Sequence, residues 1–248
     1  MARSTPFTDE LLPPSTLAGF VPTLNATGWM TAHPEPISES FIDFVAQRDD
    51  ECLDIGCAYG VATLPALARG AHILACDMEP RHLEILWQRT PEPHRSRLRI
   101  KPATLPDVRF PAESFGAILC ARALHFLRGP DITSSVRAMA GWLKTGGHLY
   151  LVSDSPYVGP WASRAPQYER RKAAGEDWPG FLSPFIDLLP PGSDLAKHPP
   201  FINPLDPDIL RREVVAAGLS VVECHWLPSL SPGGPARERA GVIARKSA

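Results

Sequence analysis

The chain of 248 residues has no apolar run long enough to span a membrane, and its amino-terminal stretch lacks the apolar core of a signal peptide. Its net charge at pH 7 is only -2, which gives no overall attraction to nucleic acid or to an anionic membrane surface. Two short basic clusters, at 95–99 and 169–172, fit solvated helix ends or loops. We therefore expect a cytoplasmic protein without nucleic-acid or membrane partners.

Cysteine is scarce, and no cysteine–histidine spacing is typical of a zinc site. The number of cysteines is odd, five, and four of them fall in apolar runs, which favours small buried side chains in a reducing compartment: Cys52, Cys76, Cys120 and Cys224. Cys57 differs because it lies in a glycine-containing loop, where either a reactive thiol or a backbone contact to a ligand fits. We expect no metal site.

Proline, by contrast, is abundant, with 28 residues, many of them between Pro156 and Pro207. This stretch is too long for an ordinary connection, and a disordered linker would be poor in aromatic residues. It carries Tyr157, Trp161, Tyr168, Trp178, Phe181, Phe185 and Phe201. We predict that 155–206 is an ordered insertion, helical at 166–175, which serves either as a cap over a binding site or as a packing appendage.

Alternating apolar runs and helical patterns predict a single α/β domain with a mostly parallel sheet. No internal repeat is present. The predicted helices cover 37–47, 61–69, 80–89, 131–143 (ending at a Gly-Gly pair at 146–147) and 207–217. The predicted strands cover 52–55, 72–76, 98–101, 115–120, 148–153, 220–226 and 240–246, of which the last two form an antiparallel hairpin.

The most informative stretch is 51–60, Glu-Cys-Leu-Asp-Ile-Gly-Cys-Ala-Tyr-Gly, which reads as a buried strand followed by a glycine loop. Glycines let the backbone turn tightly and leave room for a bulky ligand. A second apolar run ends in Asp77, where a carboxylate can accept hydrogen bonds from ribose hydroxyls. Together these features predict binding of a cofactor that contains adenosine.

The spacing of the loop separates two classes of cofactor. A nicotinamide or flavin fingerprint requires Gly-x-Gly-x-x-Gly, but Ala58 and Val61 occupy its second and third glycine positions. The pattern Asp54-x-Gly56-x-x-x-Gly60 instead resembles motif I of the class I S-adenosylmethionine-dependent methyltransferases. A tight turn without any ligand also fits the loop when it is considered alone.

Five further segments follow in the order of that family. The segment 75–78 resembles its ribose-binding turn, with Met78 placed to pack on adenine, and 101–106 resembles the loop that holds the adenine edge. The segments 114–127, 142–152 and 217–223 resemble the fourth strand with its loop, the helix–turn–strand and the entry to the sixth strand. Two departures are Gly116, where the family usually has aspartate, and Ala103-Thr104, where an acid usually faces the adenine amino group.

The resemblance implies a Rossmann-like, seven-stranded, mostly parallel sheet with helices on both faces and an antiparallel last strand. Residues 37–154 and 207–248 would form the S-adenosylmethionine-binding domain, 1–36 a segment over the cofactor site, and 155–206 the Pro/aromatic-rich cap insertion. The cofactor would be S-adenosyl-L-methionine. Its expected contacts are Asp54, Gly56, Cys57, Ala58, Gly60, Asp77, Met78, Ala103, Thr104, Leu105 and Ala121. We expect loss of the Asp77 carboxylate to weaken cofactor binding and to change fold stability little.

The candidate base is His125, which follows the fourth strand and titrates in a useful range, although it could equally pack or cap a helix. His33, Tyr157 and Trp161 are candidates for contacts to the substrate. The sequence 121–124 lacks the Asp/Asn-Pro-Pro-aromatic motif of enzymes that methylate amino groups of bases or glutamine, and it has no acids to hold magnesium.

The resulting hypothesis is metal-independent methyl transfer to an oxygen, nitrogen or sulfur atom of a small-molecule acceptor. Two alternatives stay open at this point. One is a non-catalytic protein that binds S-adenosylmethionine or S-adenosylhomocysteine, and the other, less favoured, is a nicotinamide-dependent oxidoreductase. The sequence does not indicate an oligomeric state.

Overall fold

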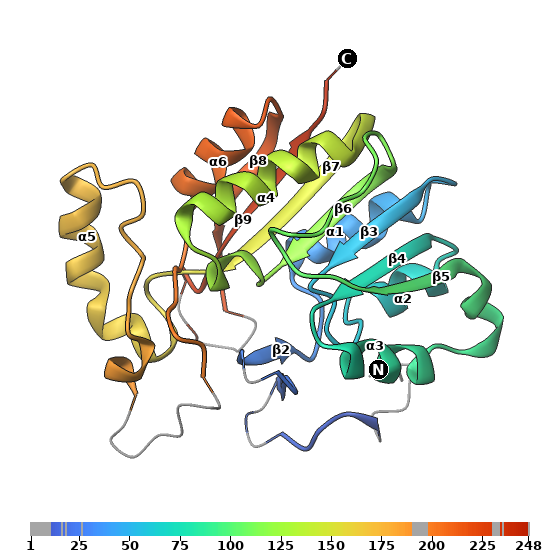
Figure 1. The fold of residues 1–248 in the computed structure, drawn as a ribbon, viewed down its shortest axis with the longest axis horizontal. Helices are drawn as coiled ribbons and strands as arrows, with labels where there is room; N and C mark the ends of the chain where they lie inside the picture. The colour runs from blue at the N-terminus through green and yellow to red at the C-terminus, as the bar shows by residue number, and fades with distance from the viewer. Residues whose placement is uncertain are drawn as a thin grey trace.

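The computed structural model describes residues 11–15, 17, 19–25, 27–189, 198–229, 234 and 236–247. Its centre is a seven-stranded sheet with the order β5-β4-β3-β6-β7-β9-β8 (Figure 1). The strands are β3 (Glu51–Ile55), β4 (His72–Asp77), β5 (Leu98–Pro102), β6 (Phe115–Ala121), β7 (Leu143–Asp154), β8 (Ser220–Leu227) and β9 (Arg239–Arg245). Strands β3 to β7 pair in parallel, and β9 runs antiparallel to both of its neighbours. The predicted fold class is confirmed.

Helices cover both faces of the sheet (Figure 1). Side chains of α1 (Pro36–Val45), α2 (Thr63–Ala68) and α3 (Pro80–Arg89) belong to one core cluster, and those of α4 (Gly129–Trp142) and α6 (Pro207–Ala216) belong to the other. Helix α5 (Ala165–Ala173) lies to one side of the sheet. Apart from α2, each of these helices has proline in its first two positions, where the missing N–H costs nothing, and this accounts for part of the high proline content.

Successive side chains of the central strands point alternately into the two hydrophobic cores, one on each face of the sheet. In β6, Ile118 and Cys120 face the α4–α6 side, whereas Ala117 and Leu119 face the α1–α2–α3 side. Both faces are apolar because a parallel sheet is covered on both sides. In β3 and β4 the buried carboxyl groups of Asp54 and Asp77 stand at the carboxyl ends of the strands.

The segment around the Gly-Gly pair differs from the prediction. Helix α4 ends at Trp142, and the chain enters β7 at once, at Leu143 rather than at 148. A β-carbon at Gly147 would lie 2.8 Å from the carbonyl oxygen of Lys144 and 2.9 Å from that of Gly116. The glycine is thus required by a close backbone approach inside the strand pair and not by a helix cap.

Gly116, which departs from the family pattern, has a packing reason. A β-carbon there would lie 2.7 Å from the β-carbon of Asp50 and 2.8 Å from Nε of Arg48. Asp50 pairs with both Arg48 and Lys144, so this end of β6 is closed by an ion cluster.

The insertion is ordered over its described parts, 155–189 and 198–206. It contains η4 (Gly159–Arg164), α5 in place of the predicted helix at 166–175, and η5 (Phe185–Leu188). Trp161, Phe185 and Ile202 form a small core of its own, and a bridge joins Leu182 to Ile202. The remaining residues of the predicted insertion, 190–197, lie outside the described residues.

Two strands were not predicted, β1 (Phe20–Pro22) and β2 (Trp29–Thr31), which pair antiparallel and face the carboxyl edge of the sheet (Figure 1). Each is only three residues long, so neither carries a readable alternation of apolar and polar side chains. Further 3₁₀ turns are η2 (Glu92–Arg97) and η3 (Leu124–Phe126).

Gly60 gives a test of how tightly the glycine loop packs on α3. Its φ is 85°, and a β-carbon would lie 2.3 Å from Cδ1 of Leu86, whereas Gly218, at φ 83°, has nothing within 4 Å. Because the two positions share the backbone strain, Gly60→Ala should lower the free energy of unfolding by about 1–3 kcal/mol more than Gly218→Ala. Urea unfolding measures both variants, and equal losses would show that Leu86 yields without cost.

Candidate active site

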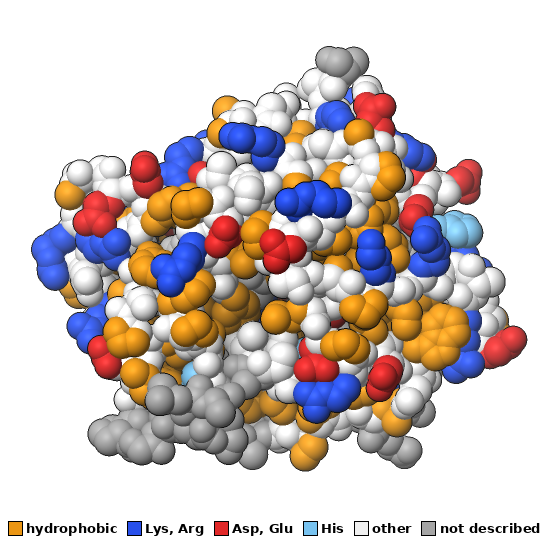
Figure 2. Space-filling model, viewed as in Figure 1, with side chains coloured by type: hydrophobic (Ala, Val, Ile, Leu, Met, Phe, Trp, Pro, Cys, Tyr) orange, Lys and Arg blue, Asp and Glu red, His pale blue; other side chains and the backbone are white. Residues whose placement is uncertain are grey.

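A cavity of about 430 Å³ opens at the carboxyl edge of the sheet. The chain runs from β3 outward to β5 on one side and from β6 to β7 on the other, so the strand order reverses between β3 and β6. Such a switch point leaves a crevice where ligands of open α/β sheets bind. Figure 2 shows hydrophobic side chains gathered around a hollow near this edge.

The residues predicted to bind the cofactor come together here. Of those predicted from the sequence, all but Gly60 line the cavity: Asp54, Gly56, Cys57, Ala58, Asp77, Met78, Ala103, Thr104, Leu105 and Ala121. Gly60 packs against Leu86 instead, as described above. The lining residues come from the ends of β3, β4, β5 and β6. These strands lie side by side in the sheet although they are far apart in the sequence.

The glycine loop is a tight turn whose backbone is bonded to β4. The N–H groups of Gly56 and Cys57 both donate to the carbonyl of Cys76, over 2.8 and 3.0 Å. Gly56 has a φ of 79°, and a β-carbon there would lie 2.9 Å from the β-carbon of Ala123. Glycine is therefore required at position 56 by the backbone conformation and by the lack of space for a side chain. Without a side chain there, the backbone itself lines the cavity. Burial raises the pKa of the Cys57 thiol well above its usual range, so this side chain is a neutral thiol rather than a reactive thiolate.

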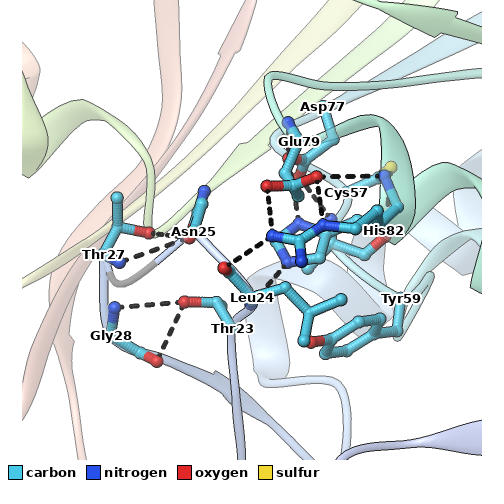
Figure 3. Close-up of polar contacts among 12 residues, drawn as sticks. Thr23, Leu24, Asn25, Thr27, Gly28, Cys57, Tyr59, Asp77, Glu79 and His82 are labelled. Atoms are coloured by element: carbon cyan, nitrogen blue, oxygen red, sulfur yellow. Dashed lines mark hydrogen bonds and ion pairs between the residues drawn. The ribbon is translucent and has the colours of Figure 1, made fainter. Parts of the chain in front are cut away.

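Asp77 ties three segments together (Figure 3). Its Oδ2 accepts from Ala58 N–H at 2.8 Å, and its Oδ1 accepts from Glu79 N–H at 2.9 Å and lies 3.0 Å from Nδ1 of His82. Loss of this carboxylate would leave those donors unpaired, so Asp77→Ala must lower fold stability as well. This corrects the expectation that stability would change little.

His82 continues the chain of hydrogen bonds to the amino-terminal segment (Figure 3). Its Nε2 accepts from the N–H of Leu24 at 2.9 Å, which leaves Nδ1 as the protonated nitrogen that donates to Asp77. The ring is 1% exposed and packs edge-on against Tyr59. The sequence did not point to His82, because an isolated histidine inside a helix pattern has no motif around it.

Asp54 lies at the end of β3 and is 3% exposed. Burial raises the pKa of its carboxyl to about 7, although Thr63 Oγ1 donates a hydrogen bond of 2.6 Å to Oδ2 and opposes the shift. A buried carboxyl on a cavity wall, poised near neutral pH, is suited to meet a cationic group of a ligand.

A second polar group lines the cavity beyond the end of β6. It includes Glu35, just before α1, and Arg122, just after β6. Arg122 donates from Nε and Nη2 to the two oxygens of Asp154, over 2.9 and 3.1 Å, and Glu35 pairs with Arg239 at 3.2 Å. The sequence analysis missed this group. The only signal was the place of Arg122 directly after a strand, at the edge where ligands bind.

His125 does not line the cavity. It is 1% exposed, its Nδ1 accepts from the N–H of Asp154 at 3.2 Å, and its Nε2 lies 3.9 Å from Asp154 Oδ2. Burial lowers its pKa to about 4, so the ring is neutral at pH 7. The expectation that His125 acts as the base is therefore corrected: the position after the strand is right, but the side chain turns into the protein interior.

The three candidates for substrate contacts also lie outside the cavity lining. His33 is exposed. Tyr157 packs edge-on against Trp226, with the Arg237 guanidinium 4.2 Å from its ring centre, and Trp161 donates from Nε1 to the carbonyl of Ser155. The insertion reaches the cavity through other residues, 198–201, of which Phe201 is the aromatic one.

Within the described part of the chain, no three His, Cys, Asp or Glu side chains are grouped so that they could hold a metal ion. In the same residues, no helix has the length and apolar character needed to cross a membrane.

A family model described as "Methyltransferase domain" matches residues 53–151. A ubiquinone biosynthesis O-methyltransferase from Marinobacter nauticus is 27% identical over 193 residues, which cover 76% of this chain and 71% of that relative. An enzyme of the same description from Xanthomonas oryzae pv. oryzae is 30% identical over 117 residues, 44% of this chain. This chain spans about half, 47%, of that second relative.

Solved structures share the fold. An S-adenosylmethionine-dependent methyltransferase from Methanosarcina mazei superposes with a TM-score of 0.63 at 18% identity, covering 87% of this chain and 99% of that one. A 1,6-didemethyltoxoflavin-N1-methyltransferase from Burkholderia thailandensis, with bound 1,6-didemethyltoxoflavin and S-adenosylhomocysteine, gives 0.57 at 16% identity, covering 86% of this chain and 80% of that one. At this level of identity the likeness establishes the fold alone.

The bridge from Asp77 through His82 to Leu24 can be tested by removing the ring nitrogens. His82→Phe keeps an aromatic ring against Tyr59 but leaves the Leu24 N–H without its acceptor, at a cost of about 1–3 kcal/mol. We expect faster hydrogen exchange of the backbone amides at 20–25 and 27–31, with His72→Phe, at an exposed position of β4, as the matched control. Unchanged exchange in this segment would show that the bridge does not hold it.

Proposed function

We propose that this chain, a member of the class I S-adenosylmethionine-dependent methyltransferase superfamily, transfers the methyl group of S-adenosylmethionine to an oxygen, nitrogen or sulfur atom of a small molecule without a metal. The observation that carries the proposal is the convergence of the motif residues on one cavity at the switch point of the sheet. Methyl transfer from a sulfonium needs little more from a protein than orientation, exclusion of water and, for some acceptors, a base.

The cofactor is S-adenosylmethionine, and the lining residues fit its parts. We assign the ribose to Asp77, whose two oxygens offer about four acceptor sites, of which Ala58, Glu79 and His82 use three. The exposed Met78 and the loop at 103–105 flank the space for adenine. Asp54 would face the ammonium group of the methionine part, since its buried carboxyl needs a positive partner.

The remainder of the cavity suits a small and largely apolar acceptor. Its wall here comes from outside the sheet: from Trp29 and Met30 in the amino-terminal segment, from Phe126 and Leu127 after β6, and from Phe201 in the insertion. We therefore assign the described residues of 1–36 and 155–206 to a cover over the acceptor side, and the described residues of 37–154 and 207–248 to cofactor binding. A cover of this kind excludes water from the reacting groups.

The non-catalytic alternative had two features of the sequence in its favour, Gly116 and the absence of an acid at Ala103-Thr104, and it loses the first, because Gly116 packs next to Asp50 and Arg48. The nicotinamide alternative is also disfavoured. The N–H of Ala58, at the second glycine position of that fingerprint, donates to the Asp77 carboxylate, which would repel a pyrophosphate at this place.

Calorimetric titration with S-adenosylhomocysteine tests the cofactor, with NADH as the control ligand. We expect S-adenosylhomocysteine to bind and NADH to give no heat, and we expect label from methyl-tritiated S-adenosylmethionine to pass to a compound in a panel of phenols, amines and thiols. Binding of NADH in place of S-adenosylhomocysteine would refute the proposed function. Binding without transfer to any member of the panel would favour a non-catalytic role.

Asp54 makes cofactor binding depend on pH. Burial raises the pKa of its carboxyl to about 7 in the free protein, so most molecules carry the protonated form at pH 6. If the cationic ammonium binds only the ionised form, affinity for S-adenosylhomocysteine should rise about tenfold from pH 6 to pH 8, because the ionised fraction rises by that factor. Proton release would appear in calorimetry as heats that depend on the buffer.

The control for this effect is Asp54→Asn, which should flatten the pH dependence and lower the affinity at pH 8. Glu223→Gln, which removes an exposed carboxyl on β8, should leave the pH dependence unchanged. An unaltered pH dependence in Asp54→Asn would assign the proton to another group.

A further inference from the structure

Glu35 is a buried carboxylate on the acceptor side of the cavity. It stands at the N-cap position of α1, but its side chain makes no capping hydrogen bond and lines the cavity instead. The residue is 2% exposed. Its Oε2 accepts from Nη1 of Arg239 at 3.2 Å, and among the described residues Oε1 receives no hydrogen bond from the protein.

The charged groups around Glu35 are balanced when one of the carboxylates is protonated. The cluster holds two guanidinium groups, Arg122 and Arg239, and three carboxylates, Glu35, Asp154 and Glu238. With every group ionised it therefore has one negative charge in excess, and protonation of one carboxylate makes it neutral. His125, which faces Asp154, is neutral at pH 7 because burial lowers its pKa to about 4, so it does not change this balance.

Glu35 is the member best placed to take that proton. Both oxygens of Asp154 are held by Arg122, and Glu238 is more exposed and is paired with Arg239. Burial raises the pKa of Glu35, whereas Arg239 and Arg122 oppose this shift and keep an ionised form accessible. A carboxylate of this kind, largely shielded from solvent and with one free oxygen, matches the requirements for a general base.

We propose that Glu35 is the general base of the methyl transfer, and that the acceptor is a phenolic hydroxyl on a flat apolar body. The proposal rests on the proposed function. A thiol ionises near pH 8.5 and needs little help, whereas a phenol ionises near pH 10 and gains most from a base. The same cavity is also lined by the aromatic residues Trp29, Phe126 and Phe201, which can receive a ring.

In this step the phenolic proton moves to Oε1 of Glu35 while the phenolic oxygen forms a bond to the methyl carbon. The bond between that carbon and sulfur breaks, and its electron pair passes to sulfur. The products are a methyl ether, S-adenosylhomocysteine and a neutral Glu35, which returns its proton to water when the ether leaves. Arg122, fixed on Asp154, stabilises negative charge that develops on the oxygen.

Glu35→Gln tests the base with two acceptors of different acidity. With 4-methoxyphenol, which stays protonated at pH 8, the variant should lose about a hundredfold or more in kcat. With 4-nitrophenol, which ionises unaided at that pH, it should lose less than about tenfold. Glu39→Gln, an exposed carboxyl on the same helix, is the matched control and should retain both rates. Equal losses with both phenols, or full turnover of both by Glu35→Gln, would overturn the proposal.

Two measurements without turnover separate catalysis from folding and cofactor binding. S-adenosylhomocysteine should bind Glu35→Gln within about threefold of its wild-type affinity, and a larger loss would make Glu35 a cofactor or folding residue, against the proposal. In the dead-end complex with S-adenosylhomocysteine at pH 6, 4-nitrophenol should show the phenolate absorption band in the wild type and the neutral band in Glu35→Gln. Failure of 4-nitrophenol to bind the wild-type complex would exclude the phenolic class.

Glu35→Asp keeps the carboxylate and should restore part of the rate with 4-methoxyphenol. The outcomes also distinguish this inference from the proposed function. A wild-type protein that binds S-adenosylhomocysteine and methylates amines or thiols, but no phenol, would keep the proposed function and refute the role of Glu35. A wild-type protein that does not bind S-adenosylhomocysteine would refute both.

Discussion

The hydrogen bonds of the Asp77 carboxylate hold the site together. They connect the glycine loop after β3, through Ala58, with the turn into α3, through Glu79, and with the amino-terminal segment, through His82 and Leu24. Other contacts join the same three segments, among them the hydrogen bond from Tyr59 Oη to the carbonyl of Pro22 at 2.9 Å and the packing of Gly60 against Leu86. Because the carboxylate is buried, each of these donors also satisfies an acceptor that would be costly to leave unpaired. A residue predicted only as a ligand contact therefore has a structural role of equal weight.

Much of the fold could be predicted because its signals are local. The strands of a covered parallel sheet are short apolar runs, and prolines mark the helix starts, so the elements from β3 to α4 follow the predicted boundaries within a few residues. The glycine loop was also predictable, since tight turns and close approaches require particular residues at fixed spacing, as at Gly56. Gly147 is an exception. A glycine pair in the sequence indicates a close approach of backbone segments, but it does not indicate whether the glycine belongs to a helix end or to a strand.

The polar cluster around Glu35 could not be predicted in the same way. Glu35 and Arg239 are 204 residues apart, and only the folded sheet brings them together at the cavity. His125 fails for a related reason, since a sequence pattern places a residue after a strand without fixing the direction of its side chain. Its ring turned inward because the backbone N–H of Asp154 needs an acceptor there. The polar groups at this edge form their contacts with residues from distant segments of the chain. Such contacts produce no regular spacing of residues in the sequence from which they could be predicted.

The charges on both sides of the cavity, around Asp54 and Asp77 and around Glu35, suit the charge changes of the proposed methyl transfer. Asp54, Asp77 and the cluster around Glu35 give the walls an excess of negative charge, which attracts a cofactor that carries a sulfonium and an ammonium group. Methyl transfer to a phenol removes the positive charge from sulfur and, in the proposed step, the negative charge from Glu35. The attraction therefore weakens on both sides at the same moment. A base placed on the acceptor wall thus favours both the attack and the release of the products, whereas a base in contact with bulk water would favour only the attack.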